Sequence, residues 1–167
     1  MIFIVQSGLL DPSRQTEWAA WYIDHLRIML TVSGVISAQR LETDALGQPP
    51  SLAMYTVESE DVFTDAYYLS IRGMGSWQPL IDTRYYVRNL FASLDEAQDV
   101  GEHQRLLVAD RDAPSGDLAG APFRWLECVG LDRSTRYRGL AVIESGNALT
   151  MGEGVVVYAP VTPRFTK

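Results

Sequence analysis

The sequence predicts an α+β fold in which strands and helices follow the order β-α-β-β-α-β, with further strands after it. Residues 2–9 form an apolar run, rich in Ile and Val and too short for a helix, which indicates a strand. From Trp18 to Met29, large side chains recur at steps of three or four, which indicates a helix packed on one face. Both patterns then recur, and this order is typical of a ferredoxin-like fold, in which two helices cover one face of a four-stranded antiparallel sheet.

Capping residues set the expected limits of the two helices. Asp11 is a good N-cap, and Pro12 suits the first helical position because an N–H would have no partner there. Gly34 offers the left-handed conformation that often ends a helix. The second helix is expected between Ser59, another N-cap, and Gly73. Short apolar runs predict the strands of this part at residues 2–9, 35–41, 52–57 and 84–91.

The chain after residue 94 has a different pattern. Residues 95–103 are an acidic connector, and residues 111–122 carry two prolines and two glycines, which do not suit a long helix. We therefore expect two units, residues 1–94 and residues 103–167, packed into one compact domain. The second unit is expected to be antiparallel and rich in strands, at residues 105–110, 123–130, 137–144 and 155–161.

A weak internal repeat relates the two units. When Gly34 is aligned with Gly130, Arg40 falls on Arg136, and an aliphatic residue follows each glycine. The second unit would then be a degenerate ferredoxin-like copy of the first that has lost most of its first helix. Chance similarity between two strand segments would give the same pattern.

Composition narrows the classes of function. The chain has 167 residues, 47% of them hydrophobic and 21% charged, which is ordinary for a globular protein. Its net charge of −7, without a basic stripe, argues against a nucleic-acid partner. No apolar stretch approaches the roughly 20 residues of a membrane span, and the N-terminus does not resemble a signal peptide. Cys128 is the one cysteine, so no intrachain disulfide can form, and we expect a cytoplasmic protein without a membrane partner.

One segment resembles a known family. It comprises Trp-Ala-Ala-Trp-Tyr-Ile-Asp-His-Leu at residues 18–26, Met-Leu-Thr-Val-Ser-Gly-Val at residues 29–35, and the pair Gln39-Arg40. This pattern resembles the EthD-like branch of the dimeric α/β-barrel superfamily, over roughly residues 1–92. The resemblance implies that fold and a homodimer, with tandem forms in some members. Related families include cofactor-free monooxygenases, muconolactone isomerases, polyketide cyclases and haem-dependent aldoxime dehydratases, so fold does not settle function.

Three residues are candidates for catalysis. His25 shares one face of the expected helix with Trp18 and Tyr22, and an imidazole can take or give a proton near neutral pH. Arg40 ends the second strand, where its guanidinium could hold a carboxylate, phenolate or enolate. Each candidate has a structural alternative. His25 and Tyr22 would be core residues, and Arg40 would lie at the surface or pair with Asp24 or Glu42.

Aromatic residues are the candidates for substrate binding, while metal binding is poorly supported. Trp21, Tyr55, Trp77 and Tyr86 could supply flat walls or phenol donors, although aromatic residues at such spacings are often plain core. The two histidines, His25 and His103, lie in separate elements without a carboxylate cluster, so we expect no metal and no cofactor. By family resemblance, haem bound through His25 remains a minor alternative.

Two functions from different classes remain open. The first is a cofactor-independent lyase, isomerase or monooxygenase that transfers a proton through His25 on a small apolar carbonyl or phenolic compound. The second is a non-catalytic ligand-binding or assembly protein. The open face of the expected sheet needs a partner, and we expect a homodimer to supply it. Closure of the barrel within one chain by residues 103–167 is the competing arrangement.

Overall fold

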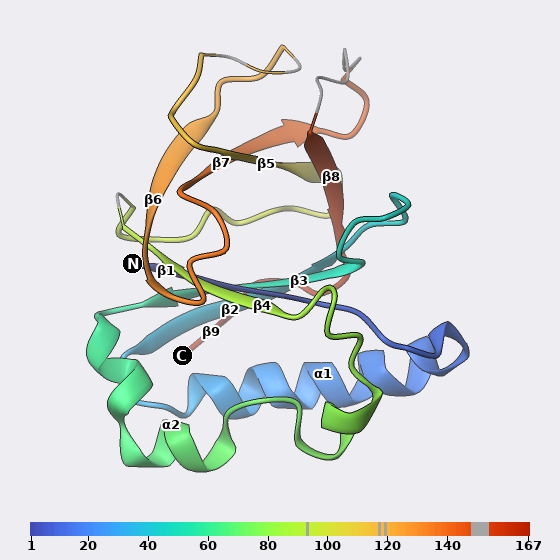
Figure 1. The fold of residues 1–167 in the computed structure, drawn as a ribbon, viewed down its shortest axis with the longest axis vertical. Helices are drawn as coiled ribbons and strands as arrows, with labels where there is room; N and C mark the ends of the chain where they lie inside the picture. The colour runs from blue at the N-terminus through green and yellow to red at the C-terminus, as the bar shows by residue number, and fades with distance from the viewer. Residues whose placement is uncertain (93, 117, 119, 148–153) are drawn as a thin grey trace.

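The computed structural model describes residues 1–92, 94–116, 118, 120–147 and 154–167 (Figure 1). Within these residues, nine strands make up one sheet: β1 (Ile2–Ser7), β2 (Val35–Glu42), β3 (Ser51–Val57), β4 (Val87–Phe91), β5 (Gln104–Arg111), β6 (Arg124–Leu131), β7 (Tyr137–Glu144), β8 (Val155–Pro160) and β9 (Phe165–Thr166). The α-helices of the described part are α1 (Gln15–Leu30) and α2 (Ala66–Ile71), and its 3₁₀ helices are η1 (Pro12–Arg14), η2 (Glu60–Thr64) and η3 (Gly75–Leu80).

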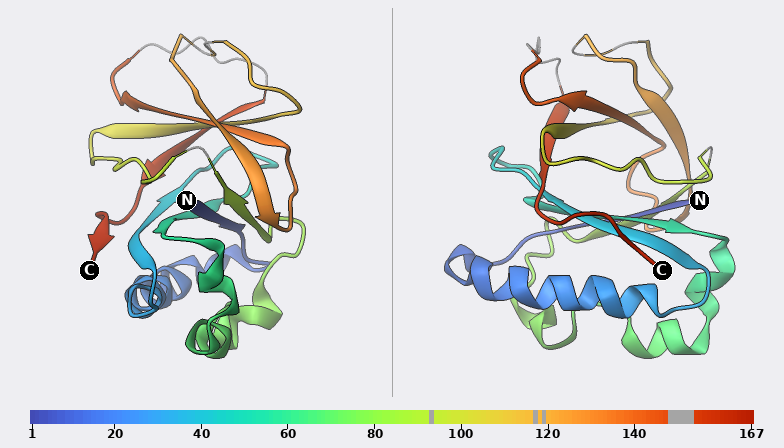
Figure 2. Two further views of the ribbon diagram at one scale, coloured as in Figure 1. Left: turned by 90° about the vertical axis from the view of Figure 1, so that its left-hand side faces the viewer. Right: turned by 180° about the vertical axis from the view of Figure 1, so that it is seen from behind.

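Eight of the strands close into an antiparallel barrel. Their order is β3-β1-β4-β6-β7-β5-β8-β2, and β2 pairs with β3 to complete the ring, while β9 adds to β2 outside it. The two units of the chain meet at β4–β6 and at β8–β2, where Phe91 lies opposite Cys128 and Leu41 opposite Pro160. Figure 2 shows the C-terminal strands lying across the sheet from the two helices.

The predicted fold class is therefore wrong. The structure is a closed, strand-rich barrel, whereas we expected a ferredoxin-like unit of the dimeric α/β-barrel type with an additional β-rich part. The physical reason is that β6 and β8 bond to both edges of the N-terminal strands, so the sheet continues through the whole chain. The face that we expected to need a second subunit is covered within the chain. This removes the reason for expecting a homodimer.

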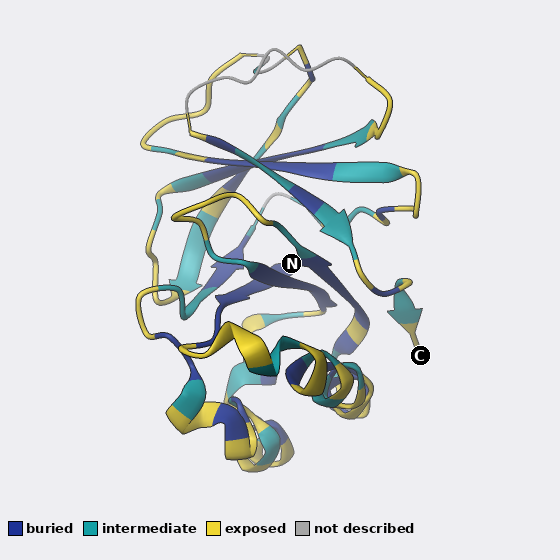
Figure 3. Cartoon of the chain, turned by 90° about the vertical axis from the view of Figure 1, so that its right-hand side faces the viewer, coloured by how far each residue is buried: buried dark blue, intermediate teal, exposed yellow. Residues whose placement is uncertain are grey.

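β1 shows how the sheet separates two cores. All six of its residues are buried, and they alternate between the two faces. Ile2 and Ile4 point into the barrel, where the apolar cluster includes Phe91 from β4. Phe3 and Val5 point to the other face, against α1 and α2. Burial on both faces explains why this strand begins with four consecutive apolar residues, Ile2 to Val5 (Figure 3).

Asp11 is an N-cap as predicted, but it caps a 3₁₀ turn, and α1 itself begins at Gln15 and ends at Leu30, before Gly34. Asp11 is the N-cap of η1, its carboxylate accepts a hydrogen bond from the Ser13 amide, and η1 leads directly into α1. Gly34 has φ +79°, in the left-handed region, directly before β2. Neither α-helix of the described part is long and apolar enough to cross a membrane.

The second helix differs from the prediction. A single helix from Ser59 is replaced by η2, an extended Asp65 and then the six-residue α2. The Asp65 carboxylate accepts a hydrogen bond from the Tyr68 amide at 2.9 Å, which starts α2 afresh. Tyr68 is consequently the residue of α2 that is buried against the strands.

Candidate functional site

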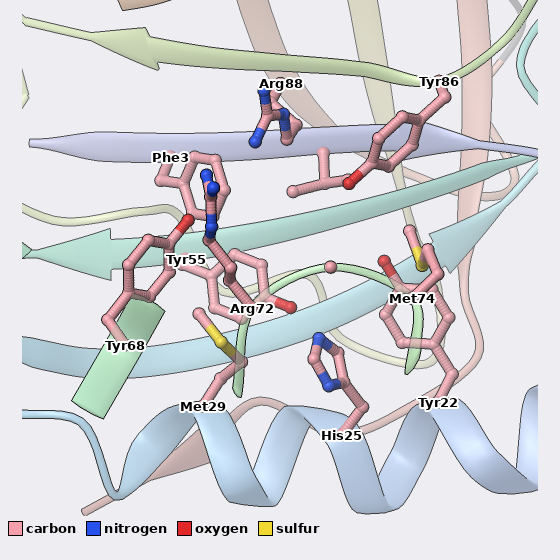
Figure 4. Close-up of a pocket in the computed structure, with 12 residues that line it drawn as sticks. Phe3, Tyr22, His25, Met29, Tyr55, Tyr68, Arg72, Met74, Tyr86 and Arg88 are labelled. Carbon is pink, nitrogen blue, oxygen red and sulfur yellow. The ribbon is translucent and has the colours of Figure 1, made fainter. Parts of the chain in front are cut away.

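A pocket lies between α1, the strands and the segment around α2 (Figure 4). α1 contributes Tyr22, His25 and Met29, whose spacings of three and four place them on the face that packs on the sheet. The remaining lining residues come from the strands, from α2 and from the chain beside them: Phe3, Val5, Tyr55, Tyr68, Arg72, Gly73, Met74, Tyr86 and Arg88.

The pocket is narrow in the structure. Its empty space is about 340 Å³, part of which is open solvent, but the centre of a water-sized sphere can reach only about 20 Å³. One water needs roughly 10–15 Å³ on the latter measure, so the pocket holds about one or two waters. A larger ligand therefore requires the lining side chains to move.

His25 forms one wall of the pocket and is surrounded by aromatic rings. Its imidazole stacks on Trp21 at 4.8 Å between ring centroids, and it packs edge-to-face with Tyr22 at 5.9 Å between centroids. No residue in the described ranges hydrogen-bonds to this imidazole. Burial lowers the pKa of His25 to about 4, so the ring is neutral at pH 7 and has a nitrogen lone pair available as an acceptor.

Phenol groups dominate the polar lining. Tyr55, Tyr68 and Tyr86 present hydroxyls that form no hydrogen bond within the described part of the chain. Burial raises the pKa of Tyr55 well above its usual value, and it raises the pKa of Tyr22 to about 12 against the opposing effect of Arg40. These phenols therefore stay protonated at neutral pH and are hydrogen-bond donors to a ligand.

Two arginines complete the lining. Arg72, an exposed residue directly after α2, makes no ion pair within the described residues. Arg88 of β4 is bound to Asp132 by one guanidinium nitrogen at 3.1 Å, while its buried Nε has no partner. Both cations are thus only partly satisfied by the protein.

Arg40 does not line this pocket. Its side chain is 1% exposed and lies over the rings of Trp18 and Tyr22, at 4.9 and 4.7 Å from their centroids. One guanidinium nitrogen is 2.6 Å from the Glu42 carboxylate, and Nε donates to the Ser51 hydroxyl. The ion pair with Glu42, one of the two alternatives for this residue, is therefore present. Asp24 pairs instead with Arg27.

Of the other predicted site residues, some line the pocket and some do not. The structure brings together Tyr22, His25, Tyr55 and Tyr86 around the pocket. Trp21 lies behind His25 as its stacking partner, and Trp77 is buried under the Arg14 guanidinium at 4.6 Å. Trp21 and Trp77 are not lining residues.

Sequence reasoning missed several residues of the pocket. Arg88 could have been found, because it lies two residues after Tyr86 and strand alternation places the two on one face. Tyr68 was missed because the expected single helix from Ser59 is interrupted at Asp65, where α2 starts afresh. Arg72 follows the helix, where no periodicity applies.

The described residues contain no group of three or more His, Cys, Asp or Glu side chains that could hold a metal ion. The space beside His25 is that of one or two waters, so a haem would require a much larger opening of the lining than a one-ring compound. Cys128, in β6, has a half-buried thiol whose pKa is raised by burial. That environment gives no thiolate ligand or nucleophile.

Comparisons with known proteins add no assignment. A scan against protein-family models finds no match. A search of curated proteins finds no similar sequence. The resemblance to the EthD-like branch therefore stays a prediction that rests on the motif residues.

Proposed function

We propose that this protein is a cofactor-independent enzyme in which His25 accepts a proton from a small carbonyl or phenolic compound. The observation that carries the proposal is a neutral imidazole on the pocket wall with no hydrogen-bond partner in the described part of the chain. A neutral ring has a nitrogen lone pair that can accept a proton, so His25 would act as the base in the first step.

The phenols of the lining can stabilise the negative charge that proton removal creates on the substrate. Removal of a proton from carbon next to a carbonyl, or from a phenol, places negative charge on an oxygen. Protonated phenols such as Tyr55 and Tyr86 donate hydrogen bonds to that oxygen, and such donors are most effective where water is excluded. Lyase, isomerase or monooxygenase steps all begin from such an anion.

A non-catalytic binding protein is the second candidate. It is favoured by the absence, among the described residues, of a carboxylate that orients the His25 ring, since catalytic bases commonly have such a third group.

Deuterium exchange separates the two candidates. The full chain is incubated in D₂O with a panel of small β-dicarbonyl and phenolic compounds, and the loss of C–H signals is followed by proton NMR. We expect exchange above the uncatalysed rate, reduced about 10²- to 10⁴-fold in a folded His25→Gln variant. The exposed His103 is the matched control, and His103→Gln should leave the rate unchanged. Full exchange by His25→Gln would exclude His25 as the base, and no exchange with any compound would favour the binding protein.

A cytoplasmic location belongs to the same proposal. It is supported by the free thiol of Cys128, which suits a reducing compartment. Fractionation of the source cells, with the protein detected by antibody, checks this location.

A further inference from the structure

The charge of the His25 pocket is one-sided. Two guanidinium groups, those of Arg72 and Arg88, are part of the lining, and none of the described lining residues is Asp or Glu. The carboxylate that pairs with this lining is that of Asp132. It accepts hydrogen bonds from the backbone amide and from the guanidinium of Arg88. The chain as a whole has a net charge of −7, so this positive lining runs against its overall charge.

The two arginines act on the same part of the pocket. Burial raises the pKa of Tyr68, and the charges of Arg88 and Arg72 oppose that increase. The same two charges oppose the increase that burial causes in the pKa of Tyr86, where Asp132 adds to it. Arg72, from the end of α2, and Arg88, from β4, therefore face a common space bounded by these two phenols (Figure 4).

Several donors of this lining have no partner in the described part of the chain. The Nε of Arg88 is buried without a partner, and Arg72 makes no ion pair within the described residues. The hydroxyls of Tyr68 and Tyr86 are likewise unpaired in that part of the chain. A buried donor without a partner destabilises a protein, and both guanidinium groups bring positive charge to the two phenols. One bound oxyanion would accept from the unpaired donors and balance that charge.

We propose that the ligand of this pocket is a small organic anion whose carboxylate or phenolate oxygen lies between Arg72 and Arg88. Its apolar body would lie against apolar residues of the lining: Phe3 and Val5 of β1, and Met74, which is two residues after Arg72. This inference rests on the proposed function, because it names the substrate class of the same pocket. Arginine is suited to the role, since its fork of donors matches a carboxylate.

Isothermal titration of the full chain with three ring compounds tests the charge requirement. Benzoate carries a carboxylate, 4-nitrophenolate carries a phenolate, and benzamide is a neutral counterpart of benzoate. We expect at least one anion to bind about 10-fold or more tightly than benzamide, because hydrogen bonds to charged groups are the stronger ones. Binding of benzoate alone identifies the carboxylate as the recognised group, and binding of 4-nitrophenolate alone identifies the phenolate.

Matched arginine variants test the location. Arg72→Gln should weaken binding of the anion about 10-fold and leave benzamide unaffected. Arg27→Gln removes the same charge from an exposed position on α1, outside the pocket, and should change neither affinity. Equal affinities for benzamide and the anions, equal losses in the two variants, or no binding of any probe at millimolar concentration would overturn the proposal.

The His25→Gln variant keeps this test separate from the test of catalysis. It should still bind the anion in an Arg72-dependent way, because glutamine removes no positive charge at neutral pH. Retained binding together with undiminished deuterium exchange in His25→Gln would end the proposed proton transfer and leave the anion site standing. Deuterium exchange that depends on His25, without any preference for anions, would end the anion site and leave the proposed proton transfer standing.

Discussion

At the scale of single residues, the properties of His25 follow from its surroundings. α1 turns the ring toward the strands, Trp21 covers one face of it, and no charged group in the described part of the chain pairs with it. Burial then lowers its pKa from 6.5 to about 4. A histidine kept neutral in this way is an acceptor of protons or hydrogen bonds near neutral pH.

The lowered pKa predicts how stability depends on pH. Between pH 6.5 and about pH 4, residue 25 is protonated in the unfolded chain but not in the folded protein. The unfolded state therefore binds more protons, and the free energy of unfolding falls as the pH falls through this window, by about 3 kcal/mol for the full shift. Urea unfolding at several pH values measures this dependence.

Glutamine cannot titrate, so His25→Gln should lose this part of the pH dependence, whereas His103→Gln should keep it. The carboxylates contribute equally to all three proteins and cancel in the comparison. Identical pH profiles for the native protein and His25→Gln would mean that the folded state does not depress the pKa of His25.

The residues of the site were predictable to different degrees. Tyr22 and His25 could be found because a helical period places them on one face, and Tyr86 because it adjoins a strand. The role of Arg40 could not be settled, because the distance to Glu42 depends on the strand and on the packing of Trp18. Arg72 has no sequence signal at all.

At the scale of elements, Gly34 is the junction on which the position of α1 depends. It lies between α1 and β2 with φ +79°, and a Cβ at this position would be 2.7 Å from the Cγ2 of Val62. Side chains therefore meet two obstacles here, the left-handed backbone and the contact with η2. Glycine at this position therefore lets the chain turn from α1 into β2 beside η2.

Gly34→Ala should lower the free energy of unfolding by about 2–4 kcal/mol, measured by chemical denaturation. Gly47→Ala is the matched control, because Gly47 has φ +76° but has no atoms within 4 Å of an added Cβ. That variant should lose about 1 kcal/mol, which is the contribution of the backbone alone. Equal losses would show that contact with Val62 contributes nothing.

The strands were predictable because their signals are local. Residues 137–144 and 155–161 were expected as strands, and β7 and β8 occupy Tyr137–Glu144 and Val155–Pro160. The fourth strand was placed too early, since Arg84 and Tyr85 belong to a turn in which Asp82 holds Arg84. Pairings such as β4–β6 join distant parts of the chain and leave no local pattern, so closure of the barrel could not be predicted.

At the scale of the whole molecule, the two units of the chain have the same internal arrangement. The first four strands occur in the order β4-β1-β3-β2, and the next four occur in the corresponding order β8-β5-β7-β6. The junctions β4–β6 and β8–β2 are equivalent under this correspondence. A tandem repeat would produce this symmetry. In the second unit, however, the segment after β5 has no α-helix in its described residues, so the outer face of those strands lacks the wall that α1 gives the first.

Closure within one chain predicts that residues 1–94 are not a stable monomer alone. Without β5–β8, the interior face of the first four strands would be exposed, including Ile2, Ile4, Leu52, Met54 and Phe91. Apolar patches of this kind lead to association or aggregation. Light scattering of the isolated fragment should therefore show oligomers or aggregates. A folded, monodisperse monomer would contradict this account of the barrel.

The central claim is that a neutral His25 and an anion site share one pocket, and the imidazole signals of the full chain test it most directly. The chain has two histidines, so a pH titration by NMR, with and without benzoate, follows His25 against His103 as an internal control. We predict that His25 protonates near pH 4 in the free protein and that benzoate shifts the signals of His25 but not those of His103. A His25 that titrates near pH 6.5, with signals that benzoate leaves unchanged, would contradict the claim.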